Sequence, residues 1–227
     1  MYKKNKVLVI IPARSGSKGI KNKNIKIIQK KPLLAHSIIY AKRCKFIDRI
    51  VVSTDSNKYA NIARKFKADV PFLRSKKLSG DKVKDYPVIR NCLKISEKYY
   101  KTLFDYIILL RPTSPFREKL LIEKGLKKLH NDKFSTSIRS VIQTKKHPYR
   151  HWKIIKKRKM ISIVPNVKEP YNIPRQQLPK MFFQTGDIEI VKRKTIMDGS
   201  ISGTRVIPLI VKSFYDIDTI DDIRNIK

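Results

Sequence analysis

From residue 7 to residue 141, short apolar runs alternate with segments of helical periodicity, and this alternation limits the chain to few folds. Residues 7–11 and 106–110 are continuous apolar runs, typical of strands that are buried on both faces. Between them, Leu33, Leu34, Ile38 and Ala41 recur at the spacing of an amphipathic helix. Strands that alternate with helices form βαβ units, so we expect an α/β domain with a mainly parallel sheet.

The predicted elements also indicate where a ligand would bind. In open α/β sheets, ligands bind beyond the carboxyl ends of the strands, where the strand order switches. The loops after Ile11, Thr54 and Leu110 are therefore the first candidates for a site. The predicted strands are 7–11, 49–54, 70–73, 106–110, 135–141, 187–191 and 205–211, and the predicted helices are 33–45, 57–67, 88–100, 118–130 and a short one from 219.

The rhythm changes between residues 143 and 183. Helical periodicity fades, and five prolines alternate with the aromatic residues Tyr149, Trp152 and Tyr171. We interpret residues 143–183 as an insertion or arm, with a hairpin around 153–164. An aromatic excursion from a closed α/β domain suits an interface between subunits.

The charge is strongly positive: 53 Lys and Arg against 18 Asp and Glu give a formal charge of +35. Such a charge suits nucleic acid, but it also suits an anionic small ligand such as a nucleotide. The longest basic run is only residues 156–159, and the other cations are scattered among hydrophobic residues. This pattern favours a lysine-rich surface on a folded domain over a basic tail, so we expect nucleic acid to bind only nonspecifically.

Several classes of protein are disfavoured. Cys44 and Cys92 are far apart and form no zinc spacing, and the four histidines show no ligand pattern. There is no apolar run of 18 residues and no recognisable signal peptide, so we expect a cytoplasmic protein with no membrane partner. A hydrophobic content of 41% is enough for a real core.

The loop over residues 12–24 has the composition of a phosphate site. Glycines allow backbone N–H groups to approach phosphate oxygens, small hydroxyls donate hydrogen bonds, and Arg14, Lys18 and Lys23 neutralise charge. The loop lacks both the Gly-Lys-Ser/Thr ending of a Walker A loop and the GxGxxG pattern. The alternative is a solvated basic loop without a ligand.

Two carboxylates near the end of the chain, Asp216 and Asp218, are separated by one residue. In an extended segment, residues i and i+2 share a face, so both carboxylates can reach one cation. Hard oxygen ligands suit Mg²⁺, which also takes phosphate oxygens and water. The alternative is that Asp218 or Thr219 caps the last helix and that Asp216 is merely solvated.

Motifs along almost the whole chain resemble the acylneuraminate cytidylyltransferases, the CMP-sialic acid synthetase family. The matching segments, in the family's order, are residues 11–19 with Lys23 and Asn24, 52–55, 72–74, 78–81, 110–115, 174–179 and 216–219. The resemblance implies one cytidylyltransferase domain over residues 1–227 with a nucleotide-diphosphosugar-transferase-like fold. It further implies a Mg²⁺-dependent reaction that couples CTP to the anomeric hydroxyl of a nonulosonic acid, a nine-carbon 2-keto sugar acid, and releases pyrophosphate.

The resemblance also assigns residues and partners. We expect a homodimer in which the arm at 143–183 reaches into the partner subunit and completes its acceptor site. Lys23, Arg14 and Asp218 are the expected catalytic residues. By resemblance, the CTP site holds Arg14, Ser17, Lys18, Lys23, Asn24, Arg74 and Asp81, the sugar-acid site holds Arg111, Thr113, Ser114, Arg175, Gln176 and Gln177, and the metal site holds Asp216 and Asp218.

Three departures from the family pattern affect the substrate. Arg111 stands where the family usually has glutamine, and a cation there can pair with a sugar carboxylate. Lys21 replaces a usual proline, and residues 183–186 replace a usual Asn-Gly entry to a strand. The acceptor therefore stays open among N-acetylneuraminate, legionaminate and pseudaminate. The alternatives are a nucleic-acid-binding protein, or the same fold acting on another sugar acid, such as an eight-carbon 2-keto acid.

Overall fold

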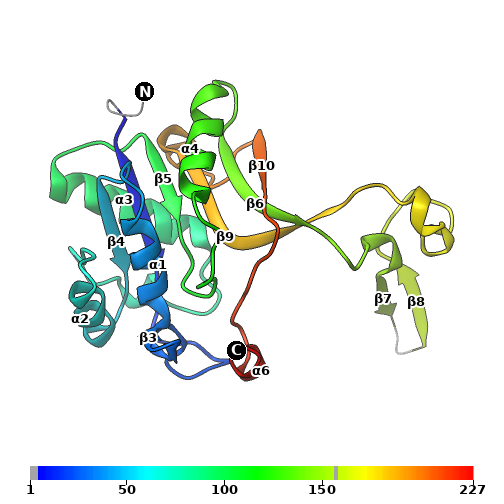
Figure 1. The fold of residues 1–227 in the computed structure, drawn as a ribbon, viewed down its shortest axis with the longest axis horizontal. Helices are drawn as coiled ribbons and strands as arrows, with labels where there is room; N and C mark the ends of the chain where they lie inside the picture. The colour runs from blue at the N-terminus through cyan, green and yellow to red at the C-terminus, as the bar shows by residue number, and fades with distance from the viewer. Residues whose placement is uncertain (1–4, 156–157, 227) are drawn as a thin grey trace.

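The structure is a computed structural model that describes residues 5–155 and 158–226. Its centre is a six-stranded sheet (Figure 1). In spatial order the strands are β10 (Val206–Ile210), β6 (Ser137–Gln143), β9 (Phe182–Lys192), β5 (Tyr106–Leu109), β1 (Val7–Pro12) and β4 (Arg49–Ser53). β1 pairs in parallel with β4 and β5, and β10 pairs in parallel with β6. Only β9 runs antiparallel to its neighbours, so the predicted α/β class with a mainly parallel sheet is confirmed.

The sheet is buried on both faces because each strand carries apolar side chains on alternate sides. Along β1, Val7, Val9 and Ile11 belong to one apolar cluster, whereas Leu8 and Ile10 belong to another, and all five are fully buried. The first cluster is completed by α1 (Leu33–Lys42), α2 (Asn57–Lys65) and α4 (Leu121–Asn131), and the second by α3 (Asp85–Tyr100) and α5 (Arg193–Met197).

The predicted strand at 70–73 is wrong. Only a single bridge forms at this edge, between Val51 and Asp69. Pro71 follows and has no N–H to donate to a ladder, so the chain leaves β4 there. Two helix starts were also misplaced. α3 begins at Asp85, because Pro87 is tolerated in its first turn, and α4 begins at Leu121, because Leu120 has a left-handed φ of 61°.

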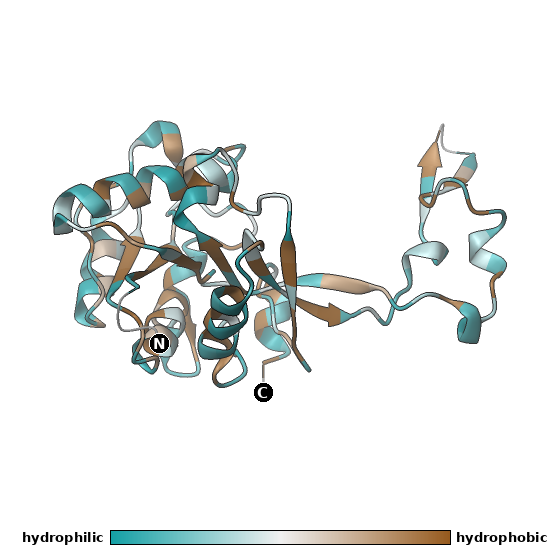
Figure 2. Cartoon of the chain, turned by 90° about the horizontal axis from the view of Figure 1, so that it is seen from above, coloured by the Kyte–Doolittle hydropathy of each residue, from teal (hydrophilic) through white to brown (hydrophobic). Residues whose placement is uncertain are grey.

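Residues 144–181, which we call the arm, leave the body on β6 and return on β9 (Figure 1). Figure 2 shows the arm standing clear of the sheet and its helices. The arm carries the hairpin of β7 (Trp152–Ile155) and β8 (Lys159–Ser162), whose strands agree with the predicted hairpin, although its turn lies partly outside the described residues. Of the described residues in the arm, only Pro170 is buried. The arm therefore has almost no core of its own.

The remaining elements are short. The last helix, α6 (Ile220–Arg224), is capped by Thr219, whose side chain forms a capping box with Asp222. No helix in the described part of the chain is both long and apolar enough to cross a membrane. The others are β2 (Ile27–Ile28), β3 (Lys31–Pro32), and the 3-10 turns η1 (Lys23–Ile25), η2 (Lys76–Leu78), η3 (Pro148–Arg150), η4 (Pro170–Asn172) and η5 (Arg175–Gln177).

Candidate active site

The loop after β1 is held by contacts at both of its ends. Ser15 donates hydrogen bonds from its backbone N–H and its hydroxyl to the carboxylate of Asp55, both at 2.8 Å. The buried Asn24 donates from Nδ2 to the carbonyl of Arg14 at 2.9 Å, which joins the end of the loop to its beginning. At Gly19, a Cβ would lie 3.0 Å from the carbonyl oxygen of Asp218, so the loop approaches the C-terminal segment closely.

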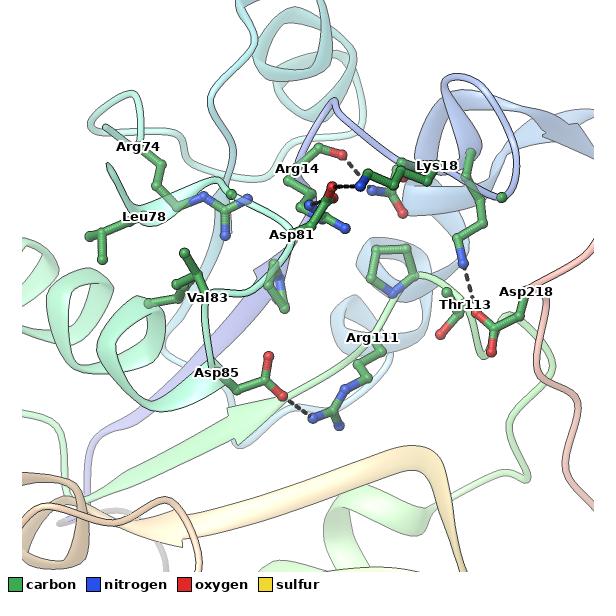
Figure 3. A pocket seen from close by; sticks show the side chains of 18 residues that line it. Arg14, Lys18, Arg74, Leu78, Asp81, Val83, Asp85, Arg111, Thr113 and Asp218 are labelled. Atoms are coloured by element: carbon green, nitrogen blue, oxygen red, sulfur yellow. Dashed lines mark hydrogen bonds and ion pairs between the residues drawn. The ribbon is translucent and has the colours of Figure 1, made fainter. Parts of the chain in front are cut away.

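This loop forms one wall of a cavity of about 460 Å³, which lies at the carboxyl ends of β1 and β5 (Figure 3). β1 lies between β4 and β5 in the sheet, so the cavity occupies the predicted switch in strand order. Its size is in the range of ligand sites. It is lined by Pro12, Arg14, Ser17, Lys18, Gly19, Lys23, Asn24, Arg74, Leu78, Gly80, Asp81, Val83, Asp85, Val88, Arg111, Pro112, Thr113 and Asp218.

Five cations and three carboxylates line the cavity, which leaves an excess of positive charge. Most of these cations already have a carboxylate partner. Arg14 and Lys18 both pair with Asp81, with Lys18 Nζ at 2.8 Å, and Lys23 Nζ lies 2.7 Å from Asp218. Lys18 and Arg14 hold the pKa of the Asp81 carboxyl below its usual value. The carboxylates therefore occupy positions in which an anionic ligand could replace them.

Arg74 differs from the other cations. Arg74 is only 6% exposed, and its Nε and Nη2 atoms have no hydrogen-bond partner among the described residues. Burial lowers its pKa, while the nearby charge of Asp55 opposes that shift. A buried guanidinium with unused donors is costly unless a ligand supplies acceptors. Arg74 therefore has two donors available for a group that enters the cavity.

Arg111 crosses the opposite wall of the cavity and joins two elements. One guanidinium nitrogen pairs with Asp85, the first residue of α3, at 2.6 Å (Figure 3). The other pairs with Glu189 on β9. Arg117 also donates to the carbonyl of Arg111, at 2.6 Å, and burial lowers the pKa of Arg117 to about 10. The loop after β5 is thus fixed by charged hydrogen bonds on both sides.

Asp216 and Asp218 meet the requirements of a divalent cation only in part. Burial raises the pKa of the Asp216 carboxyl, and the nearby charge of Asp218 raises it further. A carboxylate whose charge is destabilised by burial and by a neighbouring carboxylate is a suitable beginning for a cation site. No group of three potential protein ligands lies together in the described ranges, so substrate oxygens and water would have to complete the coordination.

The comparisons with known proteins agree with this arrangement. Residues 8–168 match the family model described as cytidylyltransferase. The chain belongs to the cytidylyltransferase family. This cytidylyltransferase is 33% identical over 216 residues to the CMP-N,N′-diacetyllegionaminic acid synthase of Campylobacter jejuni, covering 94% of this chain and 90% of the relative. It is also 33% identical over 221 residues to the post-translational flagellin modification protein B of Campylobacter coli, covering 95% and 91% of the two chains.

The fold is also similar to that of a solved CMP:2-keto-3-deoxy-manno-octonic acid synthetase complexed with CTP. The TM-score is 0.71 with 15% sequence identity, and the match covers 97% of this chain and 96% of that one. At this identity the likeness supports the fold alone. Together with the family match, it confirms the predicted fold and makes the chain a nucleotidyltransferase.

The cytidylyltransferase brings most of the residues predicted for its site into one cavity, but not all. Ser114 is buried and does not line the cavity, and Asp216 is exposed and does not line it either. Arg175, Gln176 and Gln177 form η5 on the arm and do not line the cavity of their own chain. The predicted residues that do line it are Arg14, Ser17, Lys18, Lys23, Asn24, Arg74, Asp81, Arg111, Thr113 and Asp218.

The sequence interpretation missed two carboxylates that control this site. Asp85 escaped notice because the helix was predicted to begin three residues later. Glu189 was counted as part of a strand, although a single acid inside the apolar run Ile188-Glu189-Ile190 was a visible signal. A carboxylate that is buried in a sheet needs a cation nearby, and Arg111 and Arg139 are the cations that reach it.

Proposed function

We propose that this cytidylyltransferase transfers CMP from CTP to a nonulosonic acid of the legionaminic acid type. The observation that carries the proposal is the 33% identity to CMP-N,N′-diacetyllegionaminic acid synthase over 94% of the chain. The cavity is compatible with this chemistry, because a triphosphate and a sugar carboxylate are both anionic and the cavity has an excess of cations.

In the proposed reaction, the anomeric hydroxyl oxygen of the sugar acid attacks the α-phosphorus of CTP. The bond from that phosphorus to the bridging oxygen breaks, and pyrophosphate leaves. Catalysis of this type depends on positioning and on charge stabilisation rather than on a protein nucleophile. Arg14, Lys18 and Lys23 surround the expected phosphate position, and Lys23, with its side chain only 15% exposed, is the cation best placed to stabilise charge in the transition state.

Recognition of the base is assigned to Arg74. The unused Nε–H and Nη2–H of a guanidinium form a fork of two donors. Cytosine offers two neighbouring acceptors, O2 and N3, whereas uracil carries a hydrogen on N3. A donor fork therefore prefers cytosine, and the loss of one matched hydrogen bond in a buried site penalises the wrong base strongly.

Asp216 and Asp218 are the proposed ligands of Mg²⁺. When bound, the ion polarises the phosphate and offsets the charge that develops on pyrophosphate. The Lys23 ammonium lies 2.7 Å from Asp218 in this structure, and both residues line the cavity beside the expected phosphate position. Residues 211–219 lie outside the regular strands, so both side chains can adjust when substrate arrives.

The arm suggests that the enzyme acts as a homodimer. Arg175, Gln176 and Gln177 combine a cation with two amides, a set that suits a polyhydroxylated acid, but they do not line the cavity of their own chain. They belong to the arm, which extends away from the sheet in Figure 1. A second copy that places its arm over this cavity would supply them. The exposed Trp152, Ile154 and Met160 would then be covered.

The decisive experiment measures pyrophosphate release from CTP with Mg²⁺ and a panel of acceptors. The panel contains N,N′-diacetyllegionaminate, pseudaminate, N-acetylneuraminate and the eight-carbon 2-keto-3-deoxy-manno-octonate. We expect the highest kcat/KM with the legionaminate, and no release when UTP replaces CTP. Release with none of the four acids would contradict the proposal. A preference for the eight-carbon acid would mean that the acceptor is an eight-carbon sugar acid and not a nonulosonic acid.

A further inference from the structure

Arg111 is held between two carboxylates that belong to different parts of the fold. Its Nη1 donates to Glu189 on β9, and its Nη2 donates to Asp85 at the start of α3, at 2.6 Å. Arg111 and Asp85 both line the cavity, whereas Glu189 does not. The guanidinium therefore has one partner that does not line the cavity, Glu189, and one that does, Asp85. Figure 3 shows the contact with Asp85.

The two partners differ in how easily they can be released. The side chain of Glu189 is 0% exposed, so separating it from Arg111 would leave a buried charge with no hydrogen bond and with Arg139 as its only cation partner among the described residues. Its other neighbour, Arg139 Nη2, lies 2.9 Å from Oε2 but without the geometry of a hydrogen bond, so Arg111 provides the hydrogen bond that Glu189 accepts. The side chain of Asp85 is 48% exposed, and an ion pair exposed to water contributes little to stability.

The backbone keeps Arg111 in this position. Its carbonyl accepts hydrogen bonds from Arg117 and from Ser37, at 2.6 and 3.2 Å. β9 passes close by at Gly186, where a Cβ would lie 2.7 Å from Ser114 Oγ and 3.9 Å from Arg111 Cδ. Only a residue without a side chain allows this approach. The guanidinium is thus pre-organised, with its Asp85 edge turned to the cavity.

We propose that Asp85 occupies, on Arg111, the position that the carboxylate of the acceptor takes, and that Glu189 is the positioning residue that keeps Arg111 turned to the cavity. The inference rests on the proposed function, because it concerns the acceptor of that reaction. An acceptor carboxylate exchanges one anion for another on the same guanidinium, so the charge around Glu189 is unchanged. The displaced Asp85 remains in the first turn of a long helix, where negative charge is favoured.

This exchange makes Asp85 a specificity residue. A neutral sugar has no charge with which to displace Asp85, so Arg111 stays paired with Asp85 and does not bind that sugar. A sugar acid can replace Asp85 because its carboxylate accepts the same charge-assisted hydrogen bond from Arg111 Nη2. Selection for an acidic acceptor thus follows from competition between two carboxylates and not only from the presence of a cation.

The test is a double-substitution cycle in the pyrophosphate-release assay, with N,N′-diacetyllegionaminate as the acceptor. Asp85→Asn keeps the size of the side chain and removes the competing charge. We expect it to lower the acceptor KM about 2- to 5-fold, the weight of one exposed ion pair, while kcat and the KM for CTP stay unchanged. Arg111→Gln should raise the acceptor KM about 10-fold or more. In the Arg111→Gln background, Asp85→Asn should have no further effect.

Substitutions of Glu189 test its positioning role, and a substitution of a surface carboxylate serves as the control. Glu189→Gln should raise the acceptor KM without changing the KM for CTP, and Glu189→Asp should restore part of the loss. Asp198→Asn, which removes an exposed carboxylate paired with Lys194, is the matched control and should change neither KM. If Glu189→Gln does not fold, the Asp85 and Arg111 double-substitution cycle still tests the proposal. The Asp85 side chain is exposed, so its substitution should not disturb folding.

The outcomes separate the two proposals. Turnover by the wild-type enzyme with an unchanged acceptor KM in Asp85→Asn overturns the inference alone. The inference alone is also overturned if Asp85→Asn lowers the acceptor KM in the Arg111→Gln background, or if Asp85→Asn changes the KM for CTP. No turnover by the wild-type enzyme with any acid overturns the proposed function and this inference together.

Discussion

The body and the arm belong to one chain, but their apolar side chains differ in how far they are buried. The five apolar residues from Val7 to Ile11 in β1 are 0% exposed, whereas Ile154 and Met160 in the arm are 69% and 55% exposed. The body therefore contains the apolar burial that stabilises a fold, and the arm does not. The residues proposed for the nucleotide lie in the body, and the predicted acceptor residues Arg175 to Gln177 lie on the arm. Positioning of the triphosphate is thus assigned to the part of the chain that contains the apolar clusters.

The strongest test of the body concerns Lys23. Lys23→Ala should lower kcat/KM about 10²- to 10³-fold, the usual effect of losing one pre-organised donor to a developing charge. Lys21→Ala changes a lysine of the same loop that does not line the cavity, and it should leave kcat/KM near the wild-type value. Equal losses in the two variants would show that general positive charge, and not the place of Lys23, supports catalysis.

The difference in burial can be tested with one chemical change made twice. Ile108→Ala removes a fully buried side chain from β5 and should lower the free energy of unfolding by about 2–5 kcal/mol. Ile154→Ala makes the same change on the arm and should alter the free energy of unfolding by less than about 0.5 kcal/mol. Urea titrations at low protein concentration measure the free energy of unfolding of both variants. A large effect of Ile154→Ala under those conditions would mean that the arm is covered within a single subunit.

The arm is tested by complementation. Arg175→Ala should raise the acceptor KM about 10-fold, because a charge-assisted contact to the sugar acid is lost. In a 1:1 mixture of Arg175→Ala and Lys23→Ala subunits, each mixed dimer contains one intact site if the arm serves the partner subunit. About a quarter of all sites should then be active after subunit exchange. A mixture no more active than the mean of its components would place the arm residues outside the partner's site.

The smallest expected effect concerns the ion pairs of the cavity. Lys18 and Arg14 lower the pKa of the Asp81 carboxyl in the folded protein. Its contribution to stability is therefore present above the pKa of the unfolded chain, about 3.9, and is lost as the pH falls through the lower folded value. Asp81→Asn should melt slightly below the wild type at pH 7, and the two melting temperatures should converge at acid pH. A constant difference at all pH values would rule out this linkage.

The sequence predicts the body well because its signals are local. Apolar runs such as Val7 to Ile11 mark buried strands without knowledge of their neighbours, and the composition of residues 12–24 indicates a candidate anion site in a loop that does line the cavity. The strand expected at 70–73 failed because the propensity of Val70, Phe72 and Leu73 was given more weight than the missing N–H of Pro71.

The acid partners of Arg111 could not be predicted in the same way. Asp85 and Glu189 lie 26 and 78 positions from Arg111 in the sequence, so only the folded sheet brings them together. The arm shows a second kind of limit. Its prolines and aromatic residues indicate an excursion, but nothing in them sets its direction or the surface that covers it, because both depend on the rest of the assembly.

One feature of the arm has an evolutionary consequence. The arm leaves from the end of β6 and returns at the start of β9, where Gln143 pairs with Phe182 and Thr144 donates to the carbonyl of Met181 at 3.0 Å. Its two junctions are therefore neighbours in space, and the segment between them can be exchanged without moving the strands that line the cavity. A lineage can then keep the cavity of the body and acquire a different arm by exchange of the gene segment that encodes residues 144–181.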